Sequence, residues 1–180
     1  MESEQEKFGV NSSEPTKNMI LKITTEPNPI LHKVGAQIAP TNLISGKYNQ
    51  LIVDMVETMY ADDGVGIAAP QVGQSIQLCV IAKQYNPIDA KQDLILINPV
   101  WEKLSILKKT DEEGCLSVPN IYGKVKRYTK IRVKAFDQAG KPISFIAKDF
   151  PARIIQHEVD HLDGILFIEK AKNLHKIEKE

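Results

Sequence analysis

Residues 156–164 read Gln-His-Glu-Val-Asp-His-Leu-Asp-Gly, and this stretch decides both the fold and the chemistry that we expect of the chain. Residues four apart lie on one face of a helix, so His157 and His161 could hold one metal ion between them. Glu158 could reach a water molecule beside that metal. Apolar positions at helical spacing flank the histidines: Ile154, Ile155, Val159 and Leu162. The pattern predicts a buried metal-binding helix, because buried imidazoles need a polar partner.

The helix that carries these histidines has clear limits in the sequence. Asp149 and Pro151 are typical of a first helical turn, and Gly164 is typical of the position just after a helix. An earlier helix is expected to begin at residue 41 or 42 and to end at the Asp-Asp-Gly turn of residues 62–64. Its apolar positions follow the helical repeat: Ile44, Leu51, Met55, Val56 and Met59.

Short β-like runs occupy the region between these two helices: residues 77–82, 94–98, 100–107, 130–136 and 143–147. Segments rich in Gly, Pro, Asn or Asp separate the runs, which favours mostly antiparallel sheet. The charged tail, residues 169–180, is expected to form a C-terminal helix. The predicted fold class is therefore α+β, with antiparallel β-sheets around a central helix that carries the histidines.

Length and composition favour a single folded domain. The chain has 180 residues, of which 42% are apolar and 26% charged, as in folded globular proteins. Residues 1–18 are polar and rich in glutamate, so we expect them to form a flexible leader. The domain is then predicted to cover residues 19–180.

Charge and cysteine content limit the possible partners and the compartment. Lysine plus arginine and aspartate plus glutamate both number 23, so no net field draws the chain to nucleic acid or to an anionic membrane. Two cysteines cannot form a multi-disulfide framework. No apolar run approaches the roughly 18 residues of a membrane span, and the first residues are acidic where a targeting peptide would be basic. We expect a cytoplasmic protein.

A catalytic metal usually has three protein ligands and one open position. Downstream of His161 no residue stands in a pattern that points back to the helix, and His175 is expected to be exposed in the charged tail. Upstream, residues 113–119 read Glu-Gly-Cys-Leu-Ser-Val-Pro and place Cys115 after a glycine at a strand edge. We therefore predict Cys115 as the third ligand. Cys79, within an apolar run, is expected to be a small buried hydrophobe.

A third segment of interest is residues 64–73, Gly-Val-Gly-Ile-Ala-Ala-Pro-Gln-Val-Gly. Its small residues would let an extended substrate lie against the backbone. It lacks the lysine and hydroxyl of a phosphate-binding loop and the spacing of a dinucleotide fingerprint, so both nucleotide interpretations are rejected. Gln71 is its one polar side chain able to point into a site.

Together the three segments resemble the signature segments of the peptide deformylase family, in the same order and at similar separations. The resemblance covers residues 19–170 and implies an α+β fold of antiparallel sheets around the histidine helix. It implies removal of the N-formyl group from the initiator methionine of nascent proteins, with release of formate. The implied cofactor is one divalent metal ion per chain, iron(II) in cells, with zinc, nickel or cobalt able to replace it. The implied partners are N-formylmethionyl peptides and the ribosome exit region.

The resemblance also assigns roles to individual residues. Metal ligands would be Cys115, His157 and His161, and the acid/base would be Glu158. Gln71 and the Leu116 backbone N–H would stabilise the oxyanion. Residues of the substrate site would be Val65, Gly66, Glu113, Gly114, Phe150, Arg153 and Ile154. Arg127 would pair with Glu113, although Arg127 and Arg153 could instead be ordinary surface cations. Tyr122 stands at a rim position where some members carry arginine.

Two alternatives remain open from the residues alone. The His157-Glu158 motif would also suit a zinc peptidase that cleaves internal peptide bonds, although the upstream cysteine and the missing downstream ligand argue against it. A catalytically silent binding domain could use the same ligands in a closed structural site. In that case Glu158 and Gln71 would have no role.

Overall fold

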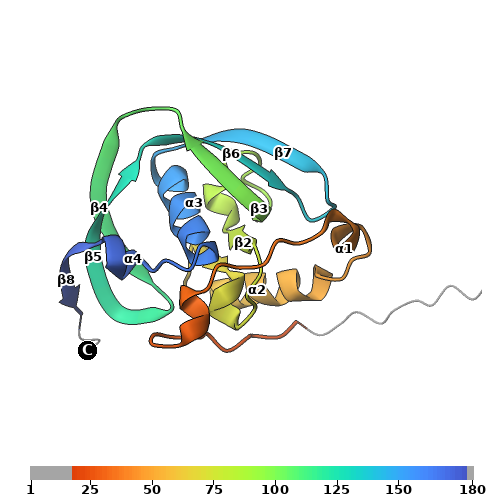
Figure 1. Ribbon diagram of the computed structural model, residues 1–180, viewed down its shortest axis with the longest axis horizontal. Helices are drawn as coiled ribbons and strands as arrows, with labels where there is room; N and C mark the ends of the chain where they lie inside the picture. Colours follow the sequence, from red (N-terminus) through yellow and green to blue (C-terminus); the bar gives the residue numbers. More distant parts are fainter. Residues whose placement is uncertain (1–17, 178–180) are drawn as a thin grey trace, which may run out of the picture.

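The computed structural model describes residues 18–177, in which two antiparallel sheets enclose a central helix, α3 (Figure 1). The helices are α1 (Pro40–Ile44), α2 (Asn49–Ala61), α3 (Asp149–Leu162) and α4 (Phe167–Lys170), with 3-10 turns η1 (Pro29–His32), η2 (Ala69–Val72) and η3 (Lys83–Tyr85). The strands are β1 (Gly66–Ala68), β2 (Leu78–Ile81), β3 (Leu94–Lys103), β4 (Lys108–Cys115), β5 (Val118–Tyr128), β6 (Lys130–Phe136), β7 (Pro142–Lys148) and β8 (Lys172–Lys176). The predicted α+β fold class is confirmed.

The larger sheet has the strand order β1-β2-β3-β6-β7, and the smaller one has the order β4-β5-β8. Strand β3 is irregular between Ile97 and Val100, where its register with β6 shifts and Asn98 takes a φ of 48°. The sequence predicted two strands here, over residues 94–98 and 100–107. Residues 94–103 form one irregular strand, because the asparagine tolerates this backbone conformation at the shift in register. Residues 104–107 of the second predicted run are not in a strand.

Helix α3 follows the sequence prediction closely. Its apolar side Ile154, Ile155, Val159 and Leu162 is at most 5% exposed and packs in one cluster with residues of β2, β3 and β6. After the helix, Gly164 has a φ of +73°, and a Cβ there would lie 2.7 Å from the His32 carbonyl carbon. A glycine is therefore required for the chain to turn against η1. This packing places both histidines of the motif at the centre of the molecule.

The single helix predicted from residue 41 or 42 to residue 61 is wrong near its start, where residues 45–48 interrupt it. The chain forms two helices, α1 and α2, because Gly46 takes a φ of +72° between them. Ile44 is consequently 76% exposed and does not join the core. In α2 the side chains of Ile52, Met55 and Met59 are buried against β1 and β2.

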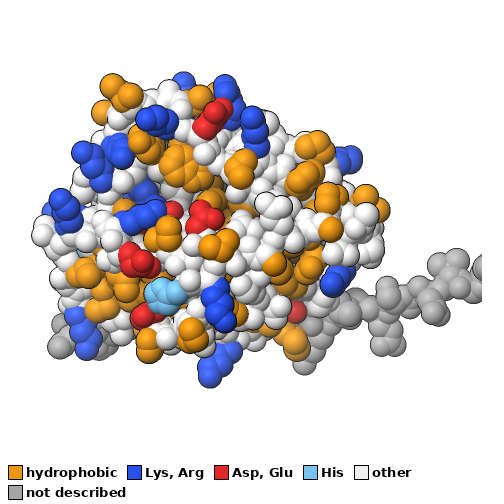
Figure 2. All heavy atoms as spheres, viewed as in Figure 1, with side chains coloured by type: hydrophobic (Ala, Val, Ile, Leu, Met, Phe, Trp, Pro, Cys, Tyr) orange, Lys and Arg blue, Asp and Glu red, His pale blue; other side chains and the backbone are white. Residues whose placement is uncertain are grey.

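The hairpin of β4 and β5 was not predicted, apart from a strand edge at Cys115. Most side chains of β4 are exposed, and the buried positions of β5 are Val118, Gly123, Val125 and Arg127, so the apolar signal is weak. Figure 2 shows many lysine and arginine side chains on the upper left of the molecule, where Figure 1 places β4, β5 and β6. The pairing continues as far as Cys115 and Val118, which flank a two-residue turn.

The charged tail also differs from its prediction. A short helix, α4, is present, but Lys172–Lys176 form strand β8 against β5, so the helix predicted for residues 169–180 is wrong there. A sheet edge supplies backbone partners that a charged, exposed helix would lack. The predicted leader lies outside the described residues, except for Asn18. Within residues 18–177 no helix is both long and apolar enough to cross a membrane.

Candidate active site

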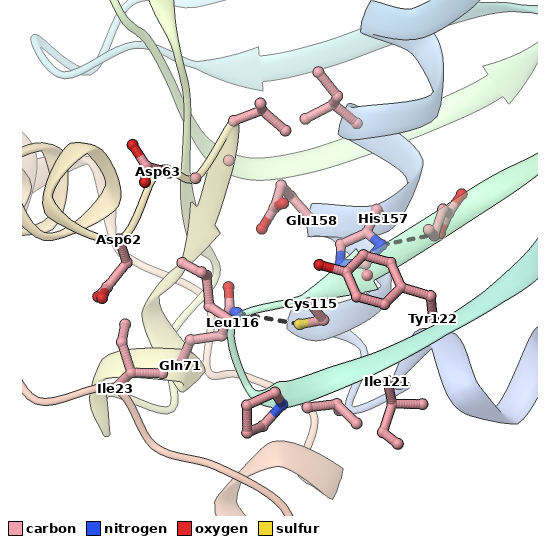
Figure 3. Close-up of a pocket in the computed structure, with 18 of the residues that line it drawn as sticks. Ile23, Asp62, Asp63, Gln71, Cys115, Leu116, Ile121, Tyr122, His157 and Glu158 are labelled. Carbon is pink, nitrogen blue, oxygen red and sulfur yellow. Dashed lines mark hydrogen bonds and ion pairs between the residues drawn. The ribbon is translucent and has the colours of Figure 1, made fainter. Parts of the chain in front are cut away.

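A cavity of about 570 Å³ opens where β1, the β4–β5 turn and α3 meet. All three segments that stood out in the sequence contribute to its wall. Figure 3 shows His157 and Glu158 on α3, facing Cys115, Leu116 and Gln71 across the site. Residues far apart in the chain therefore meet around one hollow, as a ligand site requires.

Cys115, His157 and His161 form one cluster beside this cavity. One ligand atom from each lies within 4.8 Å of the other two, and Cys115 Sγ is 3.2 Å from His161 Nε2. Ligands that share one tetrahedral metal at the usual bond lengths are about 3.5 Å apart. The helix repeat sets the two imidazoles together, and the shift in register between Gly114 and Cys115 brings the thiol toward them.

The surroundings of the cluster fit a bound cation. A thiol and two imidazoles are the donor chemistry of zinc and iron(II) sites. Two buried polar atoms, Glu158 Oε2 and His161 Nδ1, have no hydrogen-bond partner among the described residues. Such atoms are costly unless water, an ion or a ligand satisfies them. The site therefore suits a metal together with a polar molecule that the chain itself does not supply.

The two histidines have opposite electrostatic environments. Burial disfavours the charged form of His157, but hydrogen bonds to Cys115 and Glu113 outweigh burial and raise the pKa of His157 to about 10. Burial, followed by the charge of His157, holds the pKa of His161 well below its usual value. His161 is thus neutral and ready to bind a cation. His157 would lose its proton when it binds a cation, which is the normal coupling of metal binding to protonation.

Glu158 lies beside the cluster and is only 3% exposed. Burial raises its pKa to about 7, with the charge of His157 acting in the opposite direction and that of Glu113 adding to the increase. A carboxyl group with a pKa near neutrality can both accept and donate a proton at physiological pH. The environment of Glu158 therefore suits an acid/base.

Gln71 is held by its own segment and by the hairpin turn. Its Oε1 accepts a hydrogen bond from the Ala68 backbone N–H at 2.8 Å. Its Nε2 donates to Ser117 Oγ at 3.2 Å and lies 3.4 Å from Cys115 Sγ. The Leu116 N–H, in the turn after Cys115, donates to no described residue. Both N–H groups are thus placed beside the cluster, as oxyanion donors would be.

The substrate-site residues named in the sequence all line the cavity: Val65, Gly66, Glu113, Gly114, Phe150, Arg153 and Ile154. Two of them must be small. A Cβ on Gly66 would lie 2.5 Å from Glu158 Oε1, and a Cβ on Gly114 would lie 2.7 Å from the Tyr122 ring. Phe150 is 44% exposed at the cavity wall. The two glycines therefore make room for Glu158 and Tyr122, and Phe150 adds an apolar surface to the wall.

Glu113 is the centre of a buried ion network behind the cavity. It accepts hydrogen bonds from Arg127 at 2.9 and 3.0 Å and from Arg153 at 2.5 Å, and its Oε2 lies 3.0 Å from His157 Nδ1. Burial opposes its charge, but the hydrogen bonds from His157 and Arg127 hold the pKa of Glu113 well below its usual range. Arg127 and Arg153 are each 5% exposed, so the surface-cation alternative is wrong for both.

Several residues around this network were not predicted from the sequence. Ser117 contacts Gln71, Asp160 pairs with Arg127, and Lys170 pairs with Asp160. Asp160 and Ser117 lie within segments already singled out, so their position was a usable signal. Lys170 and Phe167 lie outside those segments. Only the folded chain brings Lys170 to Asp160 and the Phe167 ring to the His157 ring. His175 is half-exposed and contributes nothing to the cluster.

Comparison with known proteins agrees with this geometry. The family model for polypeptide deformylase matches residues 20–177. The chain belongs to the polypeptide deformylase family. A deformylase from Desulfotalea psychrophila is 42% identical over 156 residues, covering 86% of this chain and 89% of that protein. A deformylase from Pelotomaculum thermopropionicum is 48% identical over 136 residues, covering 73% and 83%.

Solved deformylase structures have the same fold. A class I type b peptide deformylase from Acinetobacter baumannii with Met-Ala-Ser bound is 37% identical, with a TM-score of 0.79, covering 86% of this chain and 99% of that chain. The deformylase from Thermotoga maritima is 32% identical, with a TM-score of 0.78 over 86% and 99%. Deformylases are metal-dependent hydrolases that remove the N-formyl group from nascent chains.

Proposed function

We propose that Cys115, His157 and His161 hold the catalytic metal of this deformylase and that Glu158 is its acid/base. The observation that carries the proposal is the meeting of one thiol and two imidazoles, within 4.8 Å of one another, beside a cavity lined by Glu158 and Gln71. Glu158 Oε2, which is buried without a hydrogen-bond partner among the described residues, adds support to the proposal.

The residues of the chain divide the chemistry between them. When bound, a divalent cation supplies Lewis acidity, which lowers the pKa of a water and polarises a carbonyl. Glu158 takes a proton from the attacking water, whose oxygen bonds to the formyl carbon. Gln71 Nε2 and the Leu116 N–H donate hydrogen bonds to the oxygen that becomes negative. Glu158 then gives its proton to the amine nitrogen as the C–N bond breaks, so formate and a free amino terminus are released.

The remaining cavity residues suit an N-formylmethionyl peptide. Val65, Phe150 and Ile154 supply an apolar surface for the methionine side chain. Gly66 and Gly114 let the peptide backbone approach strands β1 and β4, where it can pair as an added strand. Met-Ala-Ser bound to the Acinetobacter deformylase is the peptide left when formyl-Met-Ala-Ser loses its formyl group.

The proposal extends to the identity of the metal and to the place where the enzyme acts. One divalent ion per chain would bind, with iron(II) in cells and zinc, nickel or cobalt as possible substitutes, since a thiolate suits these softer cations. Oxidation of the thiolate or of iron(II) would then cause loss of activity in air. Residues 19–180 would form one catalytic domain that acts in the cytoplasm on chains leaving the ribosome exit region.

The deciding experiment is formate release from formyl-Met-Ala-Ser by protein prepared without oxygen. We expect one equivalent of formate per peptide, and a Glu158→Gln variant that retains metal but loses activity by several orders of magnitude. An internal-cleavage assay on an N-acetylated peptide separates deformylation from peptidase activity. Lys172→Met, a substitution on an exposed strand, is the control variant and should keep full activity. Full activity of Glu158→Gln would contradict the assigned mechanism, and cleavage of internal bonds would favour the peptidase.

A further inference from the structure

The metal ligand His157 is held from its back by a chain of ion pairs that leads to the surface. Its Nδ1 lies 3.0 Å from Glu113 Oε2, which leaves Nε2 for the metal site. Arg127 joins Glu113 to Asp160, and the Lys170 ammonium lies 2.6 Å from Asp160 Oδ1. Glu113, Arg127 and Asp160 are each at most 7% exposed, whereas the Lys170 side chain is 40% exposed. Lys170 is therefore the solvent-side end of the chain.

A second contact reaches the same imidazole from its face. The Phe167 ring stacks on the His157 ring, with centroids 6.1 Å apart and planes inclined by 25°. Phe167 is 1% exposed and packs with Leu31, Val118 and Leu166. Its own position is therefore fixed by a core, and it limits rotation of the imidazole about the bond to its helix.

Both contacts come from α4, the four-residue helix that lies outside the three signature segments. We propose that α4 is a positioning element for the metal ligand: Phe167 fixes the plane of the His157 ring, and Lys170 fixes its hydrogen bond to Glu113 through Asp160 and Arg127. The inference rests on the proposed function, because it takes His157 as a metal ligand.

The charge arrangement explains why a half-exposed lysine would matter. Arg127 bridges two buried carboxylates, Glu113 and Asp160, and Lys170 neutralises the outer oxygen of Asp160. Without the ammonium, Asp160 would attract Arg127 more strongly, and the guanidinium would bind Glu113 less tightly. Glu113 would then be fixed less firmly in place, so the direction of its hydrogen bond with His157 would be less well defined. Hydrophobic burial alone would not require a cation at position 170.

The test compares full-length chains loaded with Co(II), because its visible absorption reports ligand geometry. The rate of Co(II) transfer to a chromophoric chelator measures how firmly the site holds its metal. Loss of a direct partner of a metal-bound histidine typically costs about 10–100-fold in metal affinity. Lys170 acts through intermediates, so we expect Lys170→Met to release Co(II) about 3–10-fold faster. We expect a similar increase and a shifted absorption band for Phe167→Leu.

Controls separate positioning from general stability. Lys170→Arg keeps the cation and should release Co(II) within about twofold of the parent, and Lys172→Met, also a lysine loss near α4, should change nothing. A purely structural role would lower the unfolding temperature of Lys170→Met and Phe167→Leu while leaving Co(II) release and absorption as in the parent, and that result would overturn the inference. If the parent itself held no Co(II) and released no formate, the proposed function would fail and the inference with it.

Discussion

Gly66→Ala should slow the reaction without unfolding the protein. The added Cβ would lie 2.5 Å from Glu158 Oε1, 2.8 Å from its carboxyl carbon and 2.9 Å from its Cγ. Ordinary non-bonded contacts of this kind are about 3.4 Å or longer, so the outer part of Glu158 must move by roughly 0.9 Å. That group is the end of a flexible side chain beside a cavity, so the cost in folding free energy is small.

The cost in catalysis is expected to be larger. A misplacement of about 1 Å in a catalytic group can lower the rate about 100-fold, which corresponds to about 2.7 kcal/mol of barrier. Initial rates of formate release over a range of formyl-Met-Ala-Ser concentrations should show the loss mainly in kcat. Metal content and unfolding temperature, measured on the same sample, should match the parent. A kcat within about threefold of the parent would refute the argument that Gly66 makes room for Glu158.

Three further changes probe the buried network, the metal and the oxyanion donors. Arg127→Met removes the cation that bridges the buried carboxylates Glu113 and Asp160 and should lower the free energy of unfolding by about 3–5 kcal/mol in urea titrations. Arg132→Met, which breaks an exposed ion pair with Glu102, should cost at most about 1 kcal/mol. Equal losses would contradict the burial argument. When the free metal is at 100 times its Kd, its removal by a chelator should lower the free energy of unfolding by about 2.7 kcal/mol. Calorimetry should then show an unfolding temperature lower by roughly 5–10 °C. An unchanged unfolding temperature would argue against a bound metal. Gln71→Ala should reduce kcat by about 10²–10³ with metal content preserved, and an unaltered kcat would remove Gln71 from the mechanism.

The histidine helix could be predicted because all its signals are local. Its two histidines, apolar side and terminal glycine fall within one stretch of helical period, and the structure has α3 where the sequence placed it. Cys115 was predicted by a different route, because a catalytic metal usually has three protein ligands and the glycine before the cysteine marked a strand edge. The structure brings its thiol next to His161.

The remaining features depend on contacts that no local pattern encodes. The β4–β5 hairpin displays lysine and glutamate on its outer face, so its strands lack an apolar alternation to detect. β8 is a strand only because β5 offers it an edge. Asp160 and Lys170 pair only after α4 folds back on α3, and a charged tail by itself favours a helix over such a contact. Tertiary pairing overrode local propensity at each of these places.

The position of Cys115 at the tip of a hairpin has a consequence for how the enzyme matures. The cysteine and His161 are 46 positions apart in the chain, so the three-ligand site exists only after a long loop has closed. Before this hairpin packs against α3, a growing chain can bind a cation with two imidazoles at most. With the proposed ligands, full metal uptake would be a late event in biogenesis, and the ion would cross-link the β4–β5 hairpin to α3 in addition to the ion pairs of Arg127 and Arg153.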